Sequence, residues 1–180
     1  MGRALLLTGR PGVGKTTILR TVVARCGIRA GGFYTEEIRE GGRRTGFLLV
    51  TLDGESGMLA SVNIASRHRV GKYGVHLHDL EQVGVKSIWR AVEQPDVAAV
   101  VIDEIGKMEL FSTAFCQAVL VALDSPKTVL ASVMARSHPW VDAIKARHGI
   151  KLIEATQANR QDLPEQILRW MHQTQGVMAP

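Results

Sequence analysis

A glycine-rich segment near the start of the chain has the spacing of a phosphate-binding loop. Its sequence is Gly9-Arg10-Pro11-Gly12-Val13-Gly14-Lys15-Thr16, which matches the pattern G-x-x-x-x-G-K-[ST]. Glycines let successive backbone N–H groups turn toward one phosphate, and a helix that begins there adds the partial positive charge of its N-terminus. Lys15 would bridge the β- and γ-phosphates, and the Thr16 hydroxyl would bind Mg²⁺. The segment therefore predicts a site for a nucleoside triphosphate with magnesium.

Two adjacent carboxylates, Asp103 and Glu104, directly follow a continuous apolar run over residues 97–102. Such a run is typical of a buried parallel strand, and ligands bind at the carboxyl ends of parallel strands. We therefore expect Asp103 to lie at the same sheet edge as Lys15 and to hold Mg²⁺ through water. Glu104 would orient or deprotonate a water molecule; the alternative is a solvated carboxylate that opens the next loop.

Two further positions are candidates for contact with the ligand. Lys107 follows Asp103 by four residues, so it either reaches the γ-phosphate or pairs with Glu109. Asn159 and Arg160 stand between a predicted strand and the last predicted helix. This pair either touches the base and clamps charge, or serves as a helix cap with a surface arginine.

The histidines and cysteines do not form a metal-binding or disulfide pattern. His76 and His78 would share one face of a strand, but no third ligand is near them in sequence, which favours surface histidines over a metal site. Cys26 and Cys116 are far apart and form no C-x-x-C motif. Their spacing fits a reduced, cytoplasmic compartment.

Strand and helix patterns alternate along the chain. Strands are predicted over residues 3–8, 31–40, 44–52, 58–61, 97–102, 127–133 and 150–155, with a short candidate over 73–78; helices are predicted over residues 15–26, 80–93, 113–123, 140–147 and 162–172. Gly41-Gly42 would form the two-residue turn of a β-hairpin. The pattern predicts a three-layer α/β sandwich on a mainly parallel sheet, with a β-hairpin insertion after the first helix.

Composition excludes several classes of protein. With 180 residues, 46% hydrophobic and 22% charged, the chain fits one globular domain over residues 1–180 and is neither disordered as a whole nor membrane-spanning. The net charge of +5 would suit a phosphate ligand, nucleic acid or an acidic lipid surface. The densest basic groups are Arg39/Arg43/Arg44 and Arg67/His68/Arg69/Lys72, and only 5% of residues are aromatic. A solvated basic face with a small anionic ligand is therefore favoured over nucleic-acid binding, and we expect a monomer.

The motifs together resemble one family, the small P-loop nucleoside-triphosphatases related to the human cancer-related nucleoside-triphosphatase. The resemblance runs from residue 4 to about residue 170 and rests on the phosphate loop and on residues 32–37, 41–47, 70–75, 102–110 and 159–160. The blocks Phe-Tyr-Thr-Glu-Glu (33–37) and Asp-Glu-Ile-Gly-Lys-Met-Glu (103–109) are far more specific than the phosphate loop.

The resemblance implies Mg²⁺-dependent hydrolysis of several nucleoside triphosphates, with little base preference. Together with the motif analysis it assigns catalysis to Lys15 and Glu104 and metal binding to Thr16 and Asp103. The candidate nucleotide-binding residues are Gly9, Arg10, Pro11, Gly12, Val13, Gly14, Lys15, Thr16, Thr17, Asp103, Glu104, Ile105, Gly106, Lys107 and Arg160. A kinase that transfers the γ-phosphate to an acceptor held near residues 33–47 and Lys72 is the alternative.

The paired Asp103 and Glu104 also resemble P-loop proteins in which the catalytic glutamate adjoins the metal-binding aspartate. In those proteins another strand lies between the phosphate-loop strand and the aspartate strand. The apolar stretch at 127–133 is the candidate, so we expect it to pair with both the strand at 3–8 and the strand at 97–102.

Overall fold

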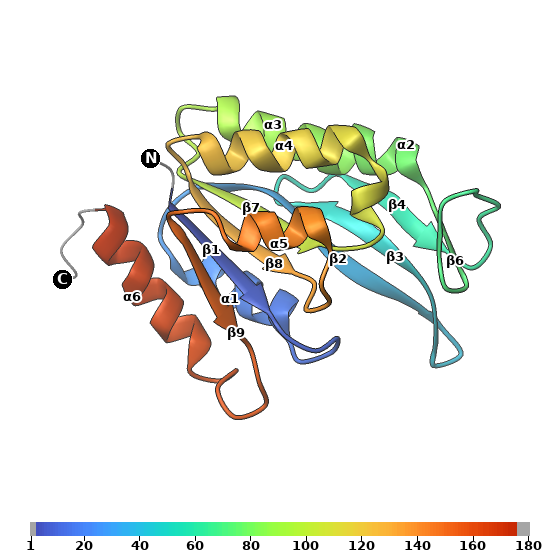
Figure 1. Cartoon of the computed structure of the whole chain (residues 1–180), viewed down its shortest axis with the longest axis horizontal. Coiled ribbons are helices and arrows are strands. Elements are labelled where there is room, and N and C mark those ends of the chain that lie inside the picture. Colours follow the sequence, from blue (N-terminus) through green and yellow to red (C-terminus); the bar gives the residue numbers. More distant parts are fainter. Residues whose placement is uncertain (1–2, 176–180) are drawn as a thin grey trace.

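A computed structural model describes residues 3–175 of the chain and shows one nine-stranded sheet with helices on both faces (Figure 1). The strand order is β5-β6-β4-β3-β2-β7-β8-β1-β9. The strands are β1 (Arg3–Thr8), β2 (Ala30–Glu40), β3 (Arg43–Thr51), β4 (Ser56–Ser61), β5 (Arg69–Val70), β6 (Tyr73–Val75), β7 (Ala99–Ile105), β8 (Thr128–Val133) and β9 (Ile150–Glu154). The three-layer α/β arrangement is therefore confirmed.

The expected central strand is β8. It pairs in parallel with β1, where Leu5 lies opposite Leu130, and in parallel with β7, where Ile102 lies opposite Ala131. This strand order brings the end of β1, and with it the phosphate loop, to within one strand of Asp103 at the end of β7. The predicted strand order is confirmed.

The sheet is more evenly mixed than a mainly parallel sheet with an added hairpin. The strands β2, β7, β8, β1 and β9 are parallel neighbours, but β3, β4, β6 and β5 continue the same sheet with antiparallel pairs. The predicted hairpin corresponds to β2 and β3, and β2 also pairs with β7, where Phe33 lies opposite Ile102. The hairpin is thus an extension of the central sheet that begins beside the aspartate strand.

Alternate residues of the buried strands pack on opposite faces. Leu5 and Leu7 of β1 join a core cluster with α1 (Lys15–Arg25) and α6 (Leu163–Gln175). Ala4 and Leu6 join the cluster under α3 (Lys86–Glu93), α4 (Thr113–Asp124) and α5 (Pro139–Lys145). The hydroxyl of Ser112 caps α4 by accepting a 3.1 Å hydrogen bond from the backbone N–H of Phe115, as its position in the sequence predicts. Within residues 3–175, no helix is long and apolar enough to cross a membrane.

The helix predicted from residue 80 begins earlier. It comprises α2 (Leu77–Asp79), a π-helical segment η1 (Leu80–Val85) and α3. The Asp79 carboxylate accepts a 2.8 Å hydrogen bond from the backbone N–H of Met58, which fixes the first turn against β4. The strand predicted over 73–78 therefore ends at Val75, and His76 and His78 do not share a strand face.

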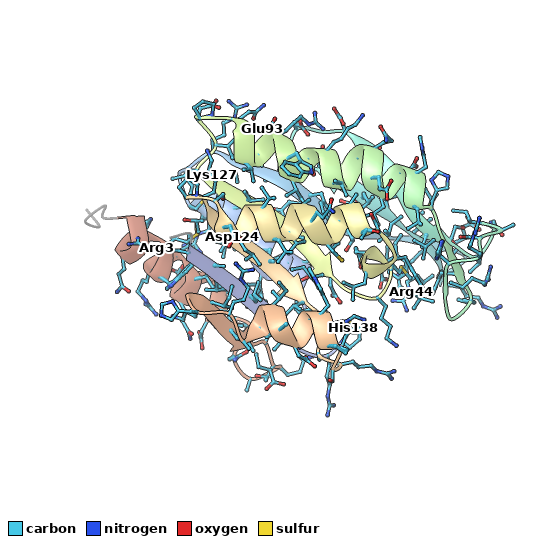
Figure 2. The ribbon with its side chains drawn as sticks, turned by 45° about the horizontal axis from the view of Figure 1, so that its top comes forward. Arg3, Arg44, Glu93, Asp124, Lys127 and His138 are labelled. Carbon is cyan, nitrogen blue, oxygen red and sulfur yellow. The ribbon has the colours of Figure 1, made fainter. Side chains whose placement is uncertain are left out.

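The candidate site residues lie at one end of the parallel strands, the end where the strands have their carboxyl termini. Figure 2 shows Arg3 and Lys127, which stand at the starts of β1 and β8, at one end of the molecule, and His138 and Arg44 toward the other. The phosphate loop follows the carboxyl end of β1, and Asp103 lies near the carboxyl end of β7, so both lie at the His138 end. This is the edge at which parallel α/β sheets bind ligands.

A substitution at Gly32 tests how closely β2 packs against β7. The Gly32 φ of +106° disfavours L side chains, and a Cβ there would overlap the carbonyl oxygen of Val101. We expect Gly32→Ala to lower the free energy of unfolding by at least about 3 kcal/mol, because both the backbone conformation and the overlap oppose it. Urea unfolding measures this loss.

Gly54 provides the matched control. It also has a positive φ, +92°, but a Cβ there would meet nothing within 4 Å. Gly54→Ala should therefore cost only about 1–2 kcal/mol. Equal losses in the two variants would show that close approach to Val101 does not matter.

Candidate active site

The loop from Gly9 to Gly14 joins β1 to α1 and has the backbone geometry of an anion-binding turn. Gly9, Gly12 and Gly14 have φ values of +142°, +78° and +108°, which side chains with a Cβ rarely adopt. A Cβ at Gly9 would lie 2.5 Å from the carbonyl oxygen of Ala155, so the loop packs closely against the end of β9. No side chain caps the N-terminus of α1, and its first turn holds no acidic residue. Its N–H groups are thus available to an anion.

Lys15 lies across this loop rather than extending into solvent. The residue is buried, with 7% of its surface exposed. Its Nζ donates a 3.2 Å hydrogen bond to the carbonyl oxygen of Gly9 and lies 3.7 Å from Oε2 of Glu104. The ammonium group is therefore held between the phosphate loop and the end of β7.

Both oxygens of the buried Asp103 carboxylate are fixed by hydroxyl groups. The Thr16 hydroxyl donates a 2.6 Å hydrogen bond to Oδ2, and the Ser132 hydroxyl donates to Oδ1. Asp103 is 1% exposed and Ser132 is fully buried. Ser132 comes from β8, so the strand between β1 and β7 also orients the carboxylate.

The donor set around Asp103 suits Mg²⁺. Hydroxyl and carboxylate oxygens are the hard ligands that this ion prefers, and Thr16 and Asp103 place them side by side. Among residues 3–175 no cluster of three or more His, Cys, Asp or Glu side chains could hold a metal ion. An ion at this site would therefore complete its coordination with water and substrate phosphates, as magnesium usually does.

Glu104 lies beside the Lys15 ammonium near the end of β7. Burial raises the pKa of its carboxyl, Lys15 opposes that shift, and the negative charge of Asp103 adds to it. Its side chain retains 34% exposure, so solvent can reach it. A partly buried carboxylate with a raised pKa is a better proton acceptor than a fully solvated one.

A second glutamate, Glu109, lies beside Glu104, and the sequence did not single it out. It begins the short helix η2 (Glu109–Phe111) and is 4% exposed. A Cβ built on Gly106 would lie 3.1 Å from Oε1 of Glu104 and 3.1 Å from Oε2 of Glu109, so the two carboxyl groups flank this glycine. Lys107 is exposed and forms no ion pair with Glu109 among the described residues, so that alternative is wrong.

The surroundings of Glu109 favour its neutral form. Burial raises the pKa of this carboxyl from 4.5 to about 8, and the charge of Glu104 adds to the shift; hydrogen bonds from the backbone N–H groups of Glu109 and Gly106 act against it. An acid whose pKa is higher in the folded chain stabilises the fold below its unfolded pKa. That stabilisation is lost as the pH rises from about 4.5 to about 8.

We expect Glu109→Gln to stabilise the fold increasingly as the pH rises, because glutamine keeps the shape of the neutral acid and cannot ionise. Relative to the parent, the gain should be small at pH ~5 and reach a few kcal/mol above pH ~8. Urea unfolding at both pH values measures it. Glu93→Gln, on the exposed end of α3, is the control and should show no such trend. A gain that is the same at both pH values would contradict the neutral state of Glu109.

Tyr34, which is outside the predicted set, lies next to the site on β2. It follows Phe33 of β2, which pairs with Ile102, so it stands level with Asp103. Burial raises the pKa of its hydroxyl to about 12; the Arg20 charge opposes this and the Asp103 charge adds to it. The Arg20 guanidinium lies 4.8 Å from the centre of the Tyr34 ring. The sequence predicts a strand here, a block specific to the resembled family at residues 33–37 and, in the kinase alternative, an acceptor held near residues 33–47.

The remaining candidates occupy different places. Arg10, Pro11, Gly12 and Thr17 are exposed on the phosphate loop and the start of α1, whereas Val13 is buried in the core below it. Ile105 is fully buried in the opposite core cluster, so any contact that it makes with a nucleotide would use its backbone.

Asn159 and Arg160 lie in the turn after β9, the strand next to β1. Asn159 accepts a 2.8 Å hydrogen bond from the backbone N–H of Thr156 and donates one of 2.9 Å to the carbonyl oxygen of Glu154. Asn159 therefore holds this turn in shape rather than reaching toward the loop. Arg160 is exposed, and its side chain forms no hydrogen bond or ion pair with Lys15 or Asp103 among the described residues.

Comparison with known proteins agrees with this geometry. The family model described as NTPase matches residues 4–168. Nucleoside-triphosphatase THEP1 of Thermotoga maritima is 48% identical over 164 residues, covering 91% of this chain and 92% of that protein. The human cancer-related nucleoside-triphosphatase is 40% identical over 177 residues, covering 91% and 93%.

Two solved structures share the fold. The crystal structure of THEP1 from Aquifex aeolicus superposes with a TM-score of 0.84 at 38% identity, covering 93% of this chain and 98% of that one. The solution structure of the human cancer-related nucleoside triphosphatase gives a TM-score of 0.81 at 38% identity, covering 95% and 98%. The family model spans most of the chain and these relatives match it over nearly their whole length, so the chain belongs to the NTPase family.

Proposed function

We propose that this chain is an Mg²⁺-dependent nucleoside-triphosphatase that hydrolyses ATP, GTP, CTP and UTP to the diphosphate and phosphate. The observation that carries the proposal is the joint placement of Lys15, Thr16, Asp103 and Glu104 at the end of β1 and β7. One group binds phosphate, two suit a magnesium ion, and one acts on water. The names of the relatives support hydrolysis of nucleoside triphosphates as the reaction.

The residues divide the work of hydrolysis among them. The N–H groups of the phosphate loop and the Lys15 ammonium bind the β- and γ-phosphates and offset their charge. Thr16 and Asp103 would hold Mg²⁺, which neutralises charge on the phosphate oxygens when bound. Glu104 orients the attacking water in line with the departing diphosphate and accepts its proton. Ser132 keeps Asp103 in position, and Glu109 keeps a neutral carboxyl beside Glu104.

Broad base tolerance follows from what these side chains can touch. Lys15, Thr16, Asp103 and Glu104 all act on phosphates, metal or water, and none of them reads a base. Arg160, the candidate for contact with the base, is exposed. A long cationic side chain of this kind can accommodate any base.

The test is phosphate release from each of the four triphosphates, with Mg²⁺ and with a chelator. We expect release from all four at rates within about tenfold of one another, and loss of release in the chelator. Release from one triphosphate only would refute the broad tolerance. Suppression of release by an added hydroxyl acceptor, with transfer of the phosphate to it, would favour the kinase.

We also propose a cell compartment and an oligomeric state for this enzyme. Both cysteines, Cys26 and Cys116, are free thiols, which supports a reducing, cytoplasmic compartment. We propose one domain over residues 1–180 that acts as a monomer, since the groups assigned to the reaction all come from one chain. Sedimentation at micromolar concentration would test the monomer.

A further inference from the structure

Most of the net charge of the chain lies in two short segments. Residues 37–46 and 62–73 together hold six arginine and lysine side chains and two glutamates, which gives +4 of the chain's +5. The rest of the chain holds 16 basic and 15 acidic side chains and is nearly neutral. The segments are separated in sequence, so the sequence alone makes the charge look dispersed.

The fold brings the two segments together. The backbone N–H of Val62 donates a 2.9 Å hydrogen bond to the carbonyl oxygen of Thr45, and the Nε of Arg44 donates a 3.1 Å hydrogen bond to the hydroxyl of Tyr73. Arg69 in turn donates a 2.8 Å hydrogen bond to the carbonyl oxygen of Lys72. The tip of the β2–β3 hairpin and the segment around β5 and β6 thus form one surface. We call it the basic tip; its basic residues are Arg39, Arg43, Arg44, Arg67, Arg69 and Lys72.

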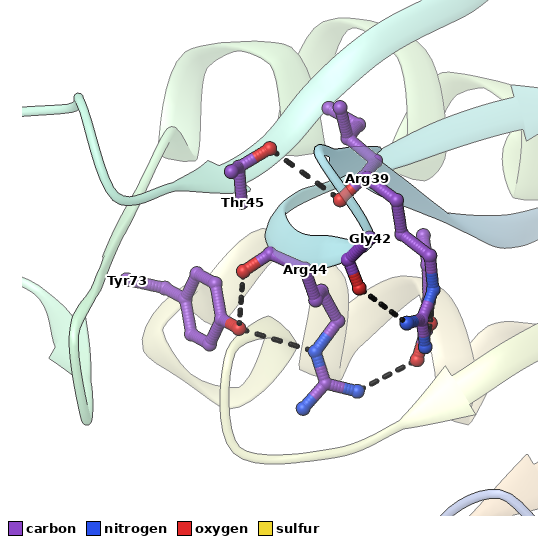
Figure 3. A network of polar contacts seen from close by, with 7 residues as sticks. Arg39, Gly42, Arg44, Thr45 and Tyr73 are labelled. Carbon is purple, nitrogen blue, oxygen red and sulfur yellow. Dashed lines mark hydrogen bonds and ion pairs between the residues drawn. The ribbon is translucent and has the colours of Figure 1, made fainter.

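The central guanidinium of the basic tip is rigidly held. Figure 3 shows Arg44 between Tyr73 and the hairpin turn. Its Nη1 donates a 2.6 Å hydrogen bond to Glu37, which also accepts hydrogen bonds of 2.9 and 2.5 Å from Arg39. The guanidinium lies 5.1 Å from the centre of the Phe47 ring. The Nη2 of Arg44 forms no hydrogen bond or ion pair within residues 3–175. Because the guanidinium is already held in place, Nη2 can bind an anion without further loss of side-chain entropy.

A hollow and an exposed aromatic ring, which could both receive nucleic-acid bases, lie next to the arginines of the basic tip. A hollow of about 410 Å³ is lined by Arg67, His68 and His76 with neighbouring residues of 64–77, a volume in the range of ligand sites. The ring of His68 lies 5.0 Å from that of Phe111, which is 39% exposed. Positive charge beside an exposed aromatic ring is the pattern that binds unpaired bases by stacking.

The basic tip and the phosphate loop both lie at the carboxyl end of the parallel strands, but they are separate from each other. Phe33 of β2 lies opposite Ile102, next to Asp103, and Arg39 follows it by six residues. At about 3.3 Å per residue, the strand carries the tip about 20 Å beyond that point. A ligand on the tip would therefore occupy a site different from that of the nucleoside triphosphate.

We propose that the basic tip binds single-stranded nucleic acid, with Arg43, Arg44 and Arg67 on backbone phosphates and Phe111 stacked on a base. The extended run of charges fits a polyanion rather than one small phosphate, and the hollow and the exposed ring need unpaired bases. This binding goes beyond hydrolysis of nucleoside triphosphates and does not depend on it.

The test is fluorescence anisotropy with labelled single strands of about 12 nucleotides, as RNA and as DNA. With about three phosphates neutralised, the logarithm of the affinity should fall against the logarithm of salt concentration with a slope of about −2. The double variant Arg43→Glu/Arg67→Glu should bind at least about tenfold more weakly at ~0.1 M salt. Phe111→Ala should weaken binding about fivefold or more.

The control is Lys151→Glu/Arg169→Glu, which changes the net charge equally. Lys151 is exposed on β9, the edge strand farthest from β5, and Arg169 is exposed on α6. Like those of Arg43 and Arg67, their side chains form no hydrogen bond or ion pair within residues 3–175. Binding by the control within about twofold of the parent supports the proposal. Equal losses in both double variants, no binding by the parent, tighter binding of a duplex, or complete competition by millimolar inorganic phosphate would each overturn it. Thermal unfolding verifies that the variants are folded.

Discussion

Replacing Glu104 by glutamine is expected to lower the turnover of ATP by about 10²–10⁴-fold while its affinity stays within a few-fold. Glutamine keeps the size of the side chain and its capacity to hydrogen bond, but it cannot accept a proton from water. Lys15, Thr16 and Asp103 hold the nucleotide and its metal in this account, so binding survives. Calorimetry measures the affinity, and phosphate release under saturating ATP measures the turnover.

Glu93→Gln, an exposed change of the same kind, is the control for Glu104→Gln and should change neither quantity. Turnover of Glu104→Gln within about threefold of the parent would refute the water-activating role. Lys107 and the hairpin carboxylates Glu36 and Glu37 would then be the next candidates. If phosphate transfer to an acceptor survives while hydrolysis falls, the chain is a kinase instead.

Replacing Lys15 by alanine should lower the affinity for every nucleoside triphosphate alike. The ammonium group lies between the loop and Glu104, and the backbone N–H groups of the loop carry only partial charges that cannot replace it. A charge-assisted hydrogen bond of this kind contributes about 1.5–3 kcal/mol, so affinity should fall at least about tenfold. The loss should not depend on the base, because the contact is made to phosphate.

Because Lys15 is buried, a second variant separates binding from folding. Lys15→Met keeps the length of the side chain and removes its charge, so it should lose affinity to the same extent. Lys86→Ala, which removes an exposed lysine of α3 outside the candidate site, is the control. Unchanged affinity for ATP in both Lys15 variants, measured by calorimetry, would contradict the assignment of the phosphate loop.

Local patterns were sufficient to predict the parts of the site that lie within one segment. The spacing of residues 9–16 predicts both the turn and the start of α1. The turn depends on the backbone of its own glycines, and the phosphate contact depends on the side chain of Lys15, so no distant segment is needed. The apolar run before Asp103 predicts a buried strand by itself. The place of β8 between β1 and β7 followed from the likeness of the Asp103-Glu104 pair to other phosphate-loop proteins, and it was correct.

Contacts between distant segments could not be predicted in this way. Ser132 orients Asp103 only because β8 lies beside β7, and its sole signal is a polar residue near the end of an apolar strand. Glu109 resembles a surface charge near Lys107 in sequence, yet η2 folds it inward against Gly106. The basic tip depends on the pairing of β3 with β4 and of β4 with β6, which no local pattern specifies.

In the proposed reaction, water attacks the γ-phosphorus of a nucleoside triphosphate at the site of Lys15, Asp103 and Glu104. Hydrolysis of ATP in water labelled with heavy oxygen, followed by mass spectrometry of both products, tests this directly. We predict one labelled oxygen in each phosphate released and none in ADP, with labelled phosphate lost in Glu104→Gln over the same time. Label in ADP, or undiminished labelling of phosphate by Glu104→Gln, would contradict the account.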